Sequence, residues 1–379
     1  MLIYADNAAT TKLSARALDA MLPYLTEQYG NPSSIHPLGQ KASRALVLAR
    51  ETAARALGAQ PSEITFTSGG SESDNQALLT AASVGKKKGK KHFIASAIEH
   101  PAILRTLEAL QENGFEITLL PVTKEGFVLP ETVADAIRDD TICVSVMMAN
   151  NETGTIQGIT SIGRICHEKG VLFHTDAVQA VGHIPVNLKE LPVDMLSLSG
   201  HKFHGPKGSG ILFARRGLEL ANLIHGGEQE RGKRAGTENL PAIVGLAAAL
   251  EEACATMSQK ADHVRPLRNA LRDALLKLPD THLNGDPDRC LPGHLNITFE
   301  GIPSEVLLPI LGANGICASA GSACAAGAAT PSHVLLALGL SPKDARSSIR
   351  FSLGDDITEE EVQCMIETIT KHVTRLRKG

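Results

Sequence analysis

A lysine directly after a predicted buried strand is the first candidate for chemistry in this sequence. The segment 193–208, VDMLSLSGHKFHGPKG, opens with apolar residues that predict a short strand over 194–198. Lys202 comes after this strand, directly behind His201 and three residues behind the hydroxyl of Ser199. A lysine partly removed from water loses proton affinity, so its amine can act as a nucleophile or form a Schiff base. A lysine in a surface turn is the alternative that this stretch alone leaves open.

A second candidate is an anion site at 68–75, SGGSESDN, between a predicted strand over 63–67 and a predicted helix over 76–82. A strand, a glycine turn, a hydroxyl and a helix start together offer free N–H groups and a positive dipole end to a phosphate. The segment has neither the lysine of a nucleotide loop nor a GxGxxG pattern, which argues against a nucleotide. A simple capped helix is the alternative.

An acid at the end of a third predicted strand, 171–174, completes the pattern. The residues after it read TDAVQ, with Asp176 and Gln179. An anion site, an acid at one strand end and a lysine at the next describe a pocket for pyridoxal phosphate. The lysine holds the aldehyde as a Schiff base, and the carboxylate keeps the pyridine nitrogen protonated so that the ring accepts electrons. Asp176 suits the second role, Lys202 the first, and Gln179 is placed to reach the ring hydroxyl.

Alternating strands and helices must position these residues. Strands are predicted over 63–67, 92–96, 116–120, 141–148, 171–174, 194–198 and 210–213, with helices between most of them. This pattern predicts an α/β fold with a mostly parallel sheet wrapped by helices, whose ligands bind beyond the carboxyl ends of the strands. Polar side chains follow nearly every strand, which a purely structural explanation does not account for: Ser71, His100, Asn151, Asp176, Gln179, Ser199, His201 and Lys202.

The C-terminal part predicts a second unit. An alanine-rich helix over 240–259 could bridge to it, and a helix over 264–278 follows. A strand over 348–352 precedes a last helix that Thr358 caps, with Glu361 completing a capping box. A chain of 379 residues fits roughly two domains.

Composition limits the partners of the chain. With 43% hydrophobic and 21% charged residues and a net charge of −4, it fits a soluble globular protein. No tryptophan and three tyrosines leave few stacking groups, and none interleaves with the basic run at 86–91, so no direct nucleic-acid binding is expected. No signal peptide and no membrane span are expected. Seven scattered cysteines without a CxxC pair favour neither disulfides nor zinc, and predict a reducing cytoplasm.

Ten short motifs, spread along the chain from residue 4 to residue 352, resemble those of a known enzyme family. The chain resembles the cysteine desulfurases of the nitrogen-fixation and iron–sulfur assembly type, in the class V aminotransferase group of the PLP-dependent transferases of fold type I. The motifs are YADNAATT at 4–11, GNPSS at 30–34, TSGGSE at 67–72, EH at 99–100, NNE at 150–152, HTDAVQ at 174–179, SGHK at 199–202, RAGT at 234–237, GSAC at 321–324 and RSSIRFS at 346–352.

The resemblance implies a fold and a cofactor site. It implies a large PLP-binding domain over 15–255 and a smaller α+β domain built from 1–14 and 256–379, which carries Arg350 and the Cys324 loop. It makes Lys202 the Schiff-base lysine and sets His100 on the cofactor ring, where it also serves acid–base steps. The cofactor-binding residues that it implies are Gly70, Ser71, His100, Asn151, Asp176, Gln179, Ser199, His201, Lys202 and Thr237.

The resemblance also implies a reaction and partners. Arg350 and Asn151 hold the carboxylate of L-cysteine, Lys202 removes the α proton, and Cys324 attacks the substrate sulfur as a thiolate. Alanine leaves and a persulfide stays on Cys324, for iron–sulfur cluster, cofactor or tRNA biosynthesis. A homodimer follows, with Thr237 reaching the partner's phosphate site, and so does a sulfur-acceptor protein. No metal is implied, apart from contact of Cys324 with a transferred cluster.

Three alternatives remain at this point. A selenocysteine lyase or a class V aminotransferase shares the cofactor chemistry, and the aminotransferase needs no cysteine nucleophile. A non-catalytic protein of this fold that acts as a partner or scaffold is the third, and the presence together of Lys202, Asp176, His100 and Cys324 argues against it. The identity of the sulfur acceptor and the preference between cysteine and selenocysteine are left open by the sequence.

Overall fold

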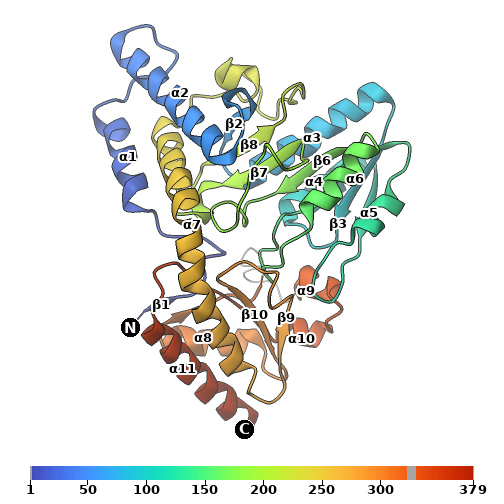
Figure 1. Ribbon diagram of the computed structural model, residues 1–379, viewed down its shortest axis with the longest axis vertical. Helices are drawn as coiled ribbons and strands as arrows, with labels where there is room; N and C mark the ends of the chain where they lie inside the picture. The colour runs from blue at the N-terminus through green and yellow to red at the C-terminus, as the bar shows by residue number, and fades with distance from the viewer. Residues whose placement is uncertain (1, 322–329, 379) are drawn as a thin grey trace.

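A seven-stranded sheet forms the centre of the larger part of the molecule (Figure 1). The computed structural model describes residues 2–321 and 330–378. The strand order is β2-β8-β7-β6-β5-β3-β4, and within this sheet β8 alone runs against the others. The strands are β2 (Ile64–Thr67), β3 (His92–Ser96), β4 (Glu116–Leu120), β5 (Thr141–Ser145), β6 (Leu172–Asp176), β7 (Met195–Ser199) and β8 (Gly210–Ala214). The predicted α/β fold with a mostly parallel sheet is confirmed.

Two smaller sheets lie at the other end of the molecule. One is antiparallel in the order β12-β10-β9, from β9 (Thr281–Asn284), β10 (His294–Phe299) and β12 (Ser348–Ser352). The other pairs β1 (Ile3–Tyr4) in parallel with β11 (Ile316–Cys317), so the N-terminal strand lies against the C-terminal part of the chain. Segments from both ends of the sequence therefore meet in this region.

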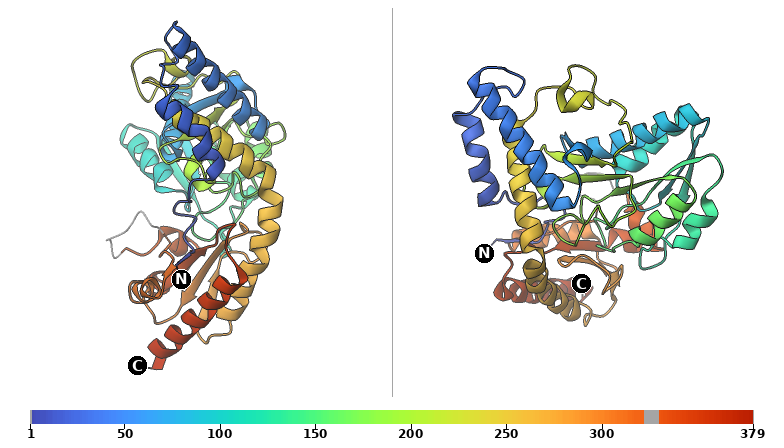
Figure 2. Two further views of the ribbon diagram at one scale, coloured as in Figure 1. Left: turned by 90° about the vertical axis from the view of Figure 1, so that its left-hand side faces the viewer. Right: turned by 45° about the horizontal axis from the view of Figure 1, so that its top comes forward.

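Helices cover the sheets and connect the two regions (Figure 2). The α-helices in the described ranges are α1 (Ala15–Thr26), α2 (Pro37–Leu57), α3 (Gly70–Lys88), α4 (Pro101–Glu112), α5 (Pro130–Ala136), α6 (Ile159–Glu168), α7 (Leu240–Leu275), α8 (Ser304–Ala313), α9 (His333–Ala337), α10 (Pro342–Arg346) and α11 (Glu359–Lys378). The short 3-10 helices are η1 (Pro61–Glu63), η2 (Gly200–Lys202) and η3 (Gln229–Gly232). The predicted capping box is present, because Thr358 and Glu361 exchange their two side chain to N–H bonds at the start of α11.

The helix predicted over 76–82 is longer than expected. It is α3, which begins at Gly70, directly after β2, and continues through three lysines to Lys88. The prediction placed 68–75 in a turn because glycine, serine, aspartate and asparagine have low helix propensity. Tertiary packing decides otherwise, since Ser73 and Asp74 are buried against the sheet. The earlier start brings the N-terminus of α3 to the edge where the strands end.

The two helices predicted over 240–259 and 264–278 are a single helix. This helix, α7, contains 36 residues and runs through Pro266. A proline in a helix removes one backbone hydrogen bond, and here burial on both sides of Pro266 outweighs that loss. Residues from Leu240 to Ala253 belong to the core around the large sheet, whereas Val264, Leu267, Leu271 and Leu275 belong to the core around the small sheets.

The small core combines the chain ends. It contains Ile3 and Ala5 together with apolar residues of β10, β12, α8 and α11. The predicted domain limits at 14/15 and 255/256 stay a prediction, although they fall near the segments where one core gives way to the other. By length and composition α7 would be long enough to cross a membrane, but half of its most apolar window is buried inside the protein. We interpret it as a core helix.

Candidate active site

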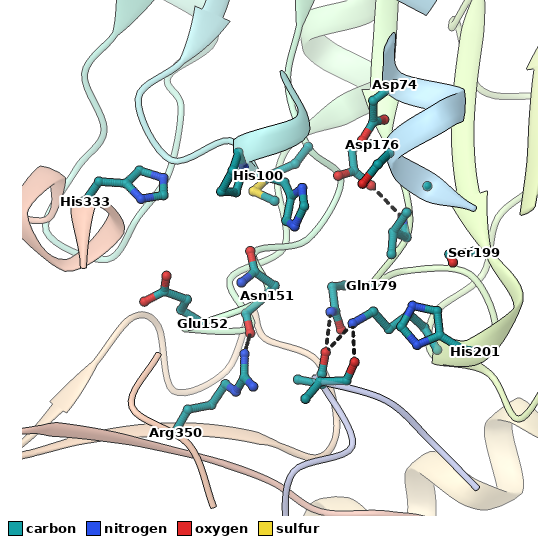
Figure 3. Close-up of a pocket in the computed structure, with 18 residues that line it drawn as sticks. Asp74, His100, Asn151, Glu152, Asp176, Gln179, Ser199, His201, His333 and Arg350 are labelled. Atoms are coloured by element: carbon teal, nitrogen blue, oxygen red, sulfur yellow. Dashed lines mark hydrogen bonds between the residues drawn. The ribbon is translucent and has the colours of Figure 1, made fainter. Parts of the chain in front are cut away.

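A cavity of about 260 Å³ opens beyond the carboxyl ends of the parallel strands (Figure 3). Ten of the residues singled out from the sequence line it: Gly70, Ser71, His100, Asn151, Asp176, Gln179, Ser199, His201, Lys202 and Arg350. They follow β2, β3, β5, β6 and β7 or lie on β12. Residues distant in the sequence therefore converge on one space.

Lys202 projects into this cavity from η2, immediately after β7. Its Nζ donates hydrogen bonds to the carbonyl oxygens of Ala8 at 2.6 Å and Ala9 at 2.8 Å. Gln179 Nε2 also donates to the Ala8 carbonyl, at 3.0 Å. The N-terminal segment thus forms a wall of the cavity and orients the amine, a role that the motif at 4–11 did not reveal from the sequence.

The N-terminus of α3 provides an anion site. Gly69 has φ 154° and ψ −177°, a conformation open essentially to glycine, and no side chain caps the helix. A Cβ on Gly70 would lie 2.6 Å from Cγ2 of Val178, so the close approach of this turn to the strand ends also requires glycine. The first N–H groups of a helix, left without a side-chain cap, favour a phosphate.

Ser199 and His201 lie beside this helix start on the next strand end. His201 Nδ1 is 3.1 Å from the hydroxyl of Thr10. Burial, with the nearby Lys202 and Lys207 ammonium groups, lowers the pKa of His201 to about 4. His201 is therefore neutral near neutral pH and offers hydrogen bonds rather than a charge.

Asp176 ends β6 as a buried carboxyl group. Its Oδ1 accepts a hydrogen bond from the N–H of Val178 at 2.8 Å. Burial raises the pKa of Asp176, and the neighbouring His100 and Lys202 oppose that rise. A buried carboxylate is stable when a cation faces it, because an unpaired charge is costly to desolvate. Asp176 is thus suited to hold a protonated ring nitrogen.

Asp74 and His174 lie behind Asp176 and were not singled out as functional. Asp74 is buried, lines the cavity and sits 3.7 Å from His174 Nε2, measured from Oδ1. Burial, followed by the charge of Asp176, raises the pKa of Asp74 well above its usual value, and burial lowers the pKa of His174 to about 3. Burial thus disfavours the charged form of both Asp74 and His174.

His100 caps α4 with its own ring. Its Nδ1 accepts the N–H of Ala102 at 3.1 Å. In a neutral imidazole one nitrogen accepts and the other carries the proton, so Nε2 is the protonated nitrogen of His100. Burial is the main cause that lowers the pKa of His100.

Arg350 lies on β12, on the side of the cavity opposite the sheet. Its Nη2 pairs with Asp6 Oδ1 at 2.8 Å, and its Nη1 donates to the Asn151 carbonyl at 2.9 Å. Arg350 is only 2% exposed, and its Nε has no hydrogen-bond partner within the described residues. A held guanidinium with donors to spare is suited to a carboxylate.

Two further residues that line the cavity, Glu152 and His333, were not singled out from the sequence. Glu152 belongs to the NNE motif, which could have indicated it, whereas His333 follows no strand and belongs to no motif. Glu152 is buried and accepts a hydrogen bond from Ser332 Oγ at 2.6 Å. His333 Nε2 is 3.0 Å from the carbonyl oxygen of Glu99.

Two predicted site residues are not placed in this cavity. Thr237 is exposed in the loop before α7 and does not line it. Cys324 lies outside the residues that the structure describes. Within 2–321 and 330–378, no group of three or more histidine, cysteine, aspartate or glutamate residues could hold a metal ion.

The residues present fit pyridoxal phosphate. The cavity combines an uncapped helix start with glycine where a Cβ would clash, a buried carboxyl group, and a lysine amine held between two carbonyls. These are the groups that would hold its phosphate, its ring nitrogen and its aldehyde carbon.

Comparison with known proteins gives a consistent answer. The model of the family described as aminotransferase class-V matches residues 3–365. The chain is 51% identical over 375 residues to "Cysteine desulfurase IscS" of Methanosarcina thermophila, with 99% of this chain and 93% of that protein covered. Among solved structures, a "NifS-like protein" is similar with a TM-score of 0.93 and 41% identity, covering 99% of this chain and 100% of that one. A structure titled "SspA in complex with cysteine" has a TM-score of 0.82 and 37% identity, over 93% of this chain and 99% of that one.

Proposed function

Because the chain belongs to the aminotransferase class-V family and, within it, to the PLP-dependent cysteine desulfurases, we propose that it converts L-cysteine to L-alanine and passes the sulfur to Cys324 as a persulfide. The observation that carries this proposal is the convergence of Lys202, Asp176, the α3 N-terminus and Arg350 on one cavity. The site thus supplies one group for each part of the cofactor and one for the substrate carboxylate.

The cofactor would be held by three sets of residues. The phosphate suits the N–H groups of Gly70 and Ser71, with Ser199 and His201 beside them. The ring nitrogen suits Asp176, whose charge Asp74 and His174 do not neutralise. Gln179 and His100 lie on the wall beside the ring site. When bound, pyridoxal phosphate accepts the electron pair that remains when a bond at the substrate Cα breaks.

In this proposal Lys202 moves a proton and His100 donates a hydrogen bond. The Nζ of Lys202, once free of the aldehyde, removes the Cα proton of the substrate, while the carbonyls of Ala8 and Ala9 keep it in place. His100 presents the N–H of Nε2, because its Nδ1 is occupied by the Ala102 N–H. It therefore serves as a hydrogen-bond donor at the face of the ring.

Arg350 and Asn151 orient the substrate. The guanidinium of Arg350 is fixed by Asp6 and by the Asn151 carbonyl, which leaves other N–H groups for the carboxylate of cysteine. A carboxylate held at this point directs the rest of the amino acid into the cavity that Lys202 also lines. Such fixed orientation lowers the entropic cost of reaching the transition state.

The experiment that tests the function compares wild type with Cys324→Ala. Alanine and sulfide are measured from L-cysteine with a reductant present. We expect wild type to form both in equal amounts and the variant to form neither. Full turnover by the variant would reassign the chain to transamination or β-elimination. Activity of the variant on selenocysteine alone would favour a selenocysteine lyase, because selenium leaves more easily than sulfur.

We also propose a homodimer in which Thr237 reaches the phosphate site of the partner. Two observations support it: Thr237 is exposed and outside its own cavity, and exposed apolar side chains gather on α1, α2 and the loop between them. These side chains are Leu18, Leu22, Leu25, Tyr29, Ile35, Val47 and Leu48. Patches of this kind mark interaction surfaces.

Mixed dimers test this arrangement. A dimer of one Lys202→Ala subunit and one Thr237→Ala subunit retains one complete site only if Thr237 acts on the partner. We expect the mixture to regain wild-type cofactor affinity at half of its sites. No regain would mean that Thr237 acts within its own subunit or not at all.

A reducing cytoplasm and a sulfur-acceptor protein complete the proposal. The six cysteines in the described residues are all free thiols. A persulfide must pass its outer sulfur to another nucleophile before the next turnover, so an acceptor is required. Sulfur transfer from the isotopically labelled enzyme to proteins of the same cell identifies it.

A further inference from the structure

Two histidines line the cavity, and their hydrogen bonds to the backbone differ in direction: one ring accepts a bond and the other donates one. His100 lies at the start of α4, and His333 lies at the start of α9. Figure 3 shows the His333 ring at the side of the cavity away from His201, with His100 nearer to it. Each ring has one nitrogen engaged by the backbone, so the backbone decides which nitrogen is left to act in the cavity.

The backbone makes His100 a donor. Its Nδ1 accepts the N–H of Ala102, and an N–H can only donate. The lone pair of Nδ1 is therefore used, and the proton of the neutral ring sits on Nε2. To accept a proton His100 would have to break its cap on α4, and burial further disfavours its charged form.

The backbone leaves Nδ1 of His333 as the nitrogen that can accept a proton. Its Nε2 lies 3.0 Å from the carbonyl oxygen of Glu99, and a carbonyl can only accept. The proton of the neutral ring therefore sits on Nε2. Nδ1 keeps its lone pair, and it has no hydrogen-bond partner within the described residues. The carbonyl that fixes this tautomer belongs to Glu99, the residue directly before His100. The same short segment therefore orients both rings.

The carboxyl group of Glu152 is close enough to stabilise a positive charge on His333. Glu152 is buried beside it, and its Oε2 accepts from Ser332 Oγ at 2.6 Å, next to His333 in the chain. Burial raises the pKa of Glu152, while the Ser332 hydrogen bond, His333 and Arg350 favour its charged form. A positive charge on His333 would therefore be stabilised by the charged form of Glu152, which the permanently charged guanidinium of Arg350 also favours.

We propose that His333 is the proton acceptor of the cavity and takes the proton of a thiol through Nδ1. The proposal rests on the desulfurase function and names a residue for its thiolate-forming step. One S–H bond breaks, one N–H bond forms on Nδ1, and the electron pair stays on sulfur as a thiolate. A thiolate, rather than a thiol, is the competent nucleophile in sulfur chemistry.

The described chain on either side of 322–329 supports this assignment. Gly321 approaches Glu152 so closely that a Cβ on it would lie 2.4 Å from Oε2. Thr330, on the other side, is two residues before Ser332 and three before His333. Both described ends are therefore next to the Glu152 and His333 side chains. The thiol is that of Cys324 or that of the substrate, and the experiment separates the two.

The test uses two substitutions that separate position from proton transfer. His333→Gln keeps an N–H donor for the Glu99 carbonyl but cannot accept a proton. His333→Ala removes the ring and leaves room for free imidazole. We expect each to lower kcat for alanine formation by about 10²-fold, and added imidazole to restore His333→Ala but not His333→Gln. His282→Gln, an exposed histidine on β9, is the matched control.

The rate of Cys324 alkylation by iodoacetamide, measured without substrate, identifies the thiol. A slower rate in His333→Gln, restored by imidazole in His333→Ala, assigns the proton to Cys324. An unchanged rate with an imidazole-restored kcat assigns it to the substrate. Wild-type turnover in His333→Gln, or losses that imidazole does not restore, would overturn the proposal. If wild type forms no alanine, the desulfurase function fails first, and unchanged alkylation rates then overturn this proposal as well.

Discussion

The two walls of the active-site cavity are built in different ways. On the sheet wall, each functional side chain lies at the end of its strand or within four residues after it, as His100, Asp176 and Lys202 do. On the opposite wall, the residues come from the two ends of the chain and from a loop, and they are joined by contacts among themselves. Asp6 holds Arg350, and Ser332 holds Glu152.

The walls also differ in their electrostatics. The sheet wall is a set of buried groups, and desolvation disfavours the charged forms of Asp74, Glu99 and His174 around Asp176. The opposite wall retains a charged guanidinium on Arg350, paired with Asp6. We infer that the sheet wall carries the chemistry at the substrate Cα, whereas the opposite wall recognises the substrate carboxylate and, through His333, takes the proton of a thiol. Helix α7 joins the two cores behind these walls.

The largest effect should come from the sheet wall. In the proposed function Lys202 both attaches the cofactor and removes the Cα proton, so we expect kcat of Lys202→Ala to fall by about 10⁴-fold. The absorbance of the holoenzyme at ~420 nm should also be lost, since this absorbance depends on the imine between the lysine and the cofactor. Lys207→Ala, an exposed lysine of the same turn, is the control and should retain both. A Lys202→Ala enzyme with normal absorbance would contradict this division of labour.

A smaller effect of a different kind should come from the opposite wall. Arg350→Lys keeps the charge but loses the planar fork, so we expect KM for L-cysteine to rise about 10-fold to 100-fold, equivalent to about 1.4–2.8 kcal/mol. The kcat should change less, because the group acts on binding. Asp6→Asn, which loosens Arg350 without removing it, should shift KM in the same direction by less. A loss confined to kcat would show that Arg350 belongs functionally with the sheet wall.

The last effect should be on stability rather than on turnover, as a pH dependence that arises on the sheet wall. Burial raises the pKa of Glu99 from 4.5 to about 8, against the hydrogen bonds from Ser96 and Met147. The unfolded chain releases this proton near 4.5 and the folded protein near 8, so unfolding becomes easier as pH rises through that window. The slope is at most about 1.4 kcal/mol per pH unit.

Glu99→Gln tests this contribution because the amide does not titrate. We expect the unfolding free energy of the variant, measured with urea from pH 5 to 8, to fall less steeply than that of wild type. Glu112→Gln, at an exposed position on α4, should keep the wild-type slope. Parallel slopes for wild type and Glu99→Gln would mean that this carboxyl group is ionised in the folded protein.

The sequence by itself determined the sheet wall. The strand periodicity around 92–96, 171–176 and 194–199 predicts parallel strands, and parallel strands bring their carboxyl ends to one edge. His100, Asp176 and Lys202 could therefore be grouped without coordinates, since local order along the chain is preserved as order along the sheet. The cofactor followed from their chemistry, and the ten motifs added the family.

Only the tertiary structure decided the opposite wall and the electrostatic states of the buried groups on the sheet wall. Nothing in the local pattern brings Ala8 to Lys202, Asp6 to Arg350 or His333 to Glu99, because these pairs are joined by the packing of two cores across the single helix α7. Propensity likewise misplaced the start of α3 and divided α7 at Pro266. Local periodicity determines which face an element buries, whereas contacts between distant segments, and the desolvation they impose on Asp74, His174 and Glu99, exist only after those segments have packed.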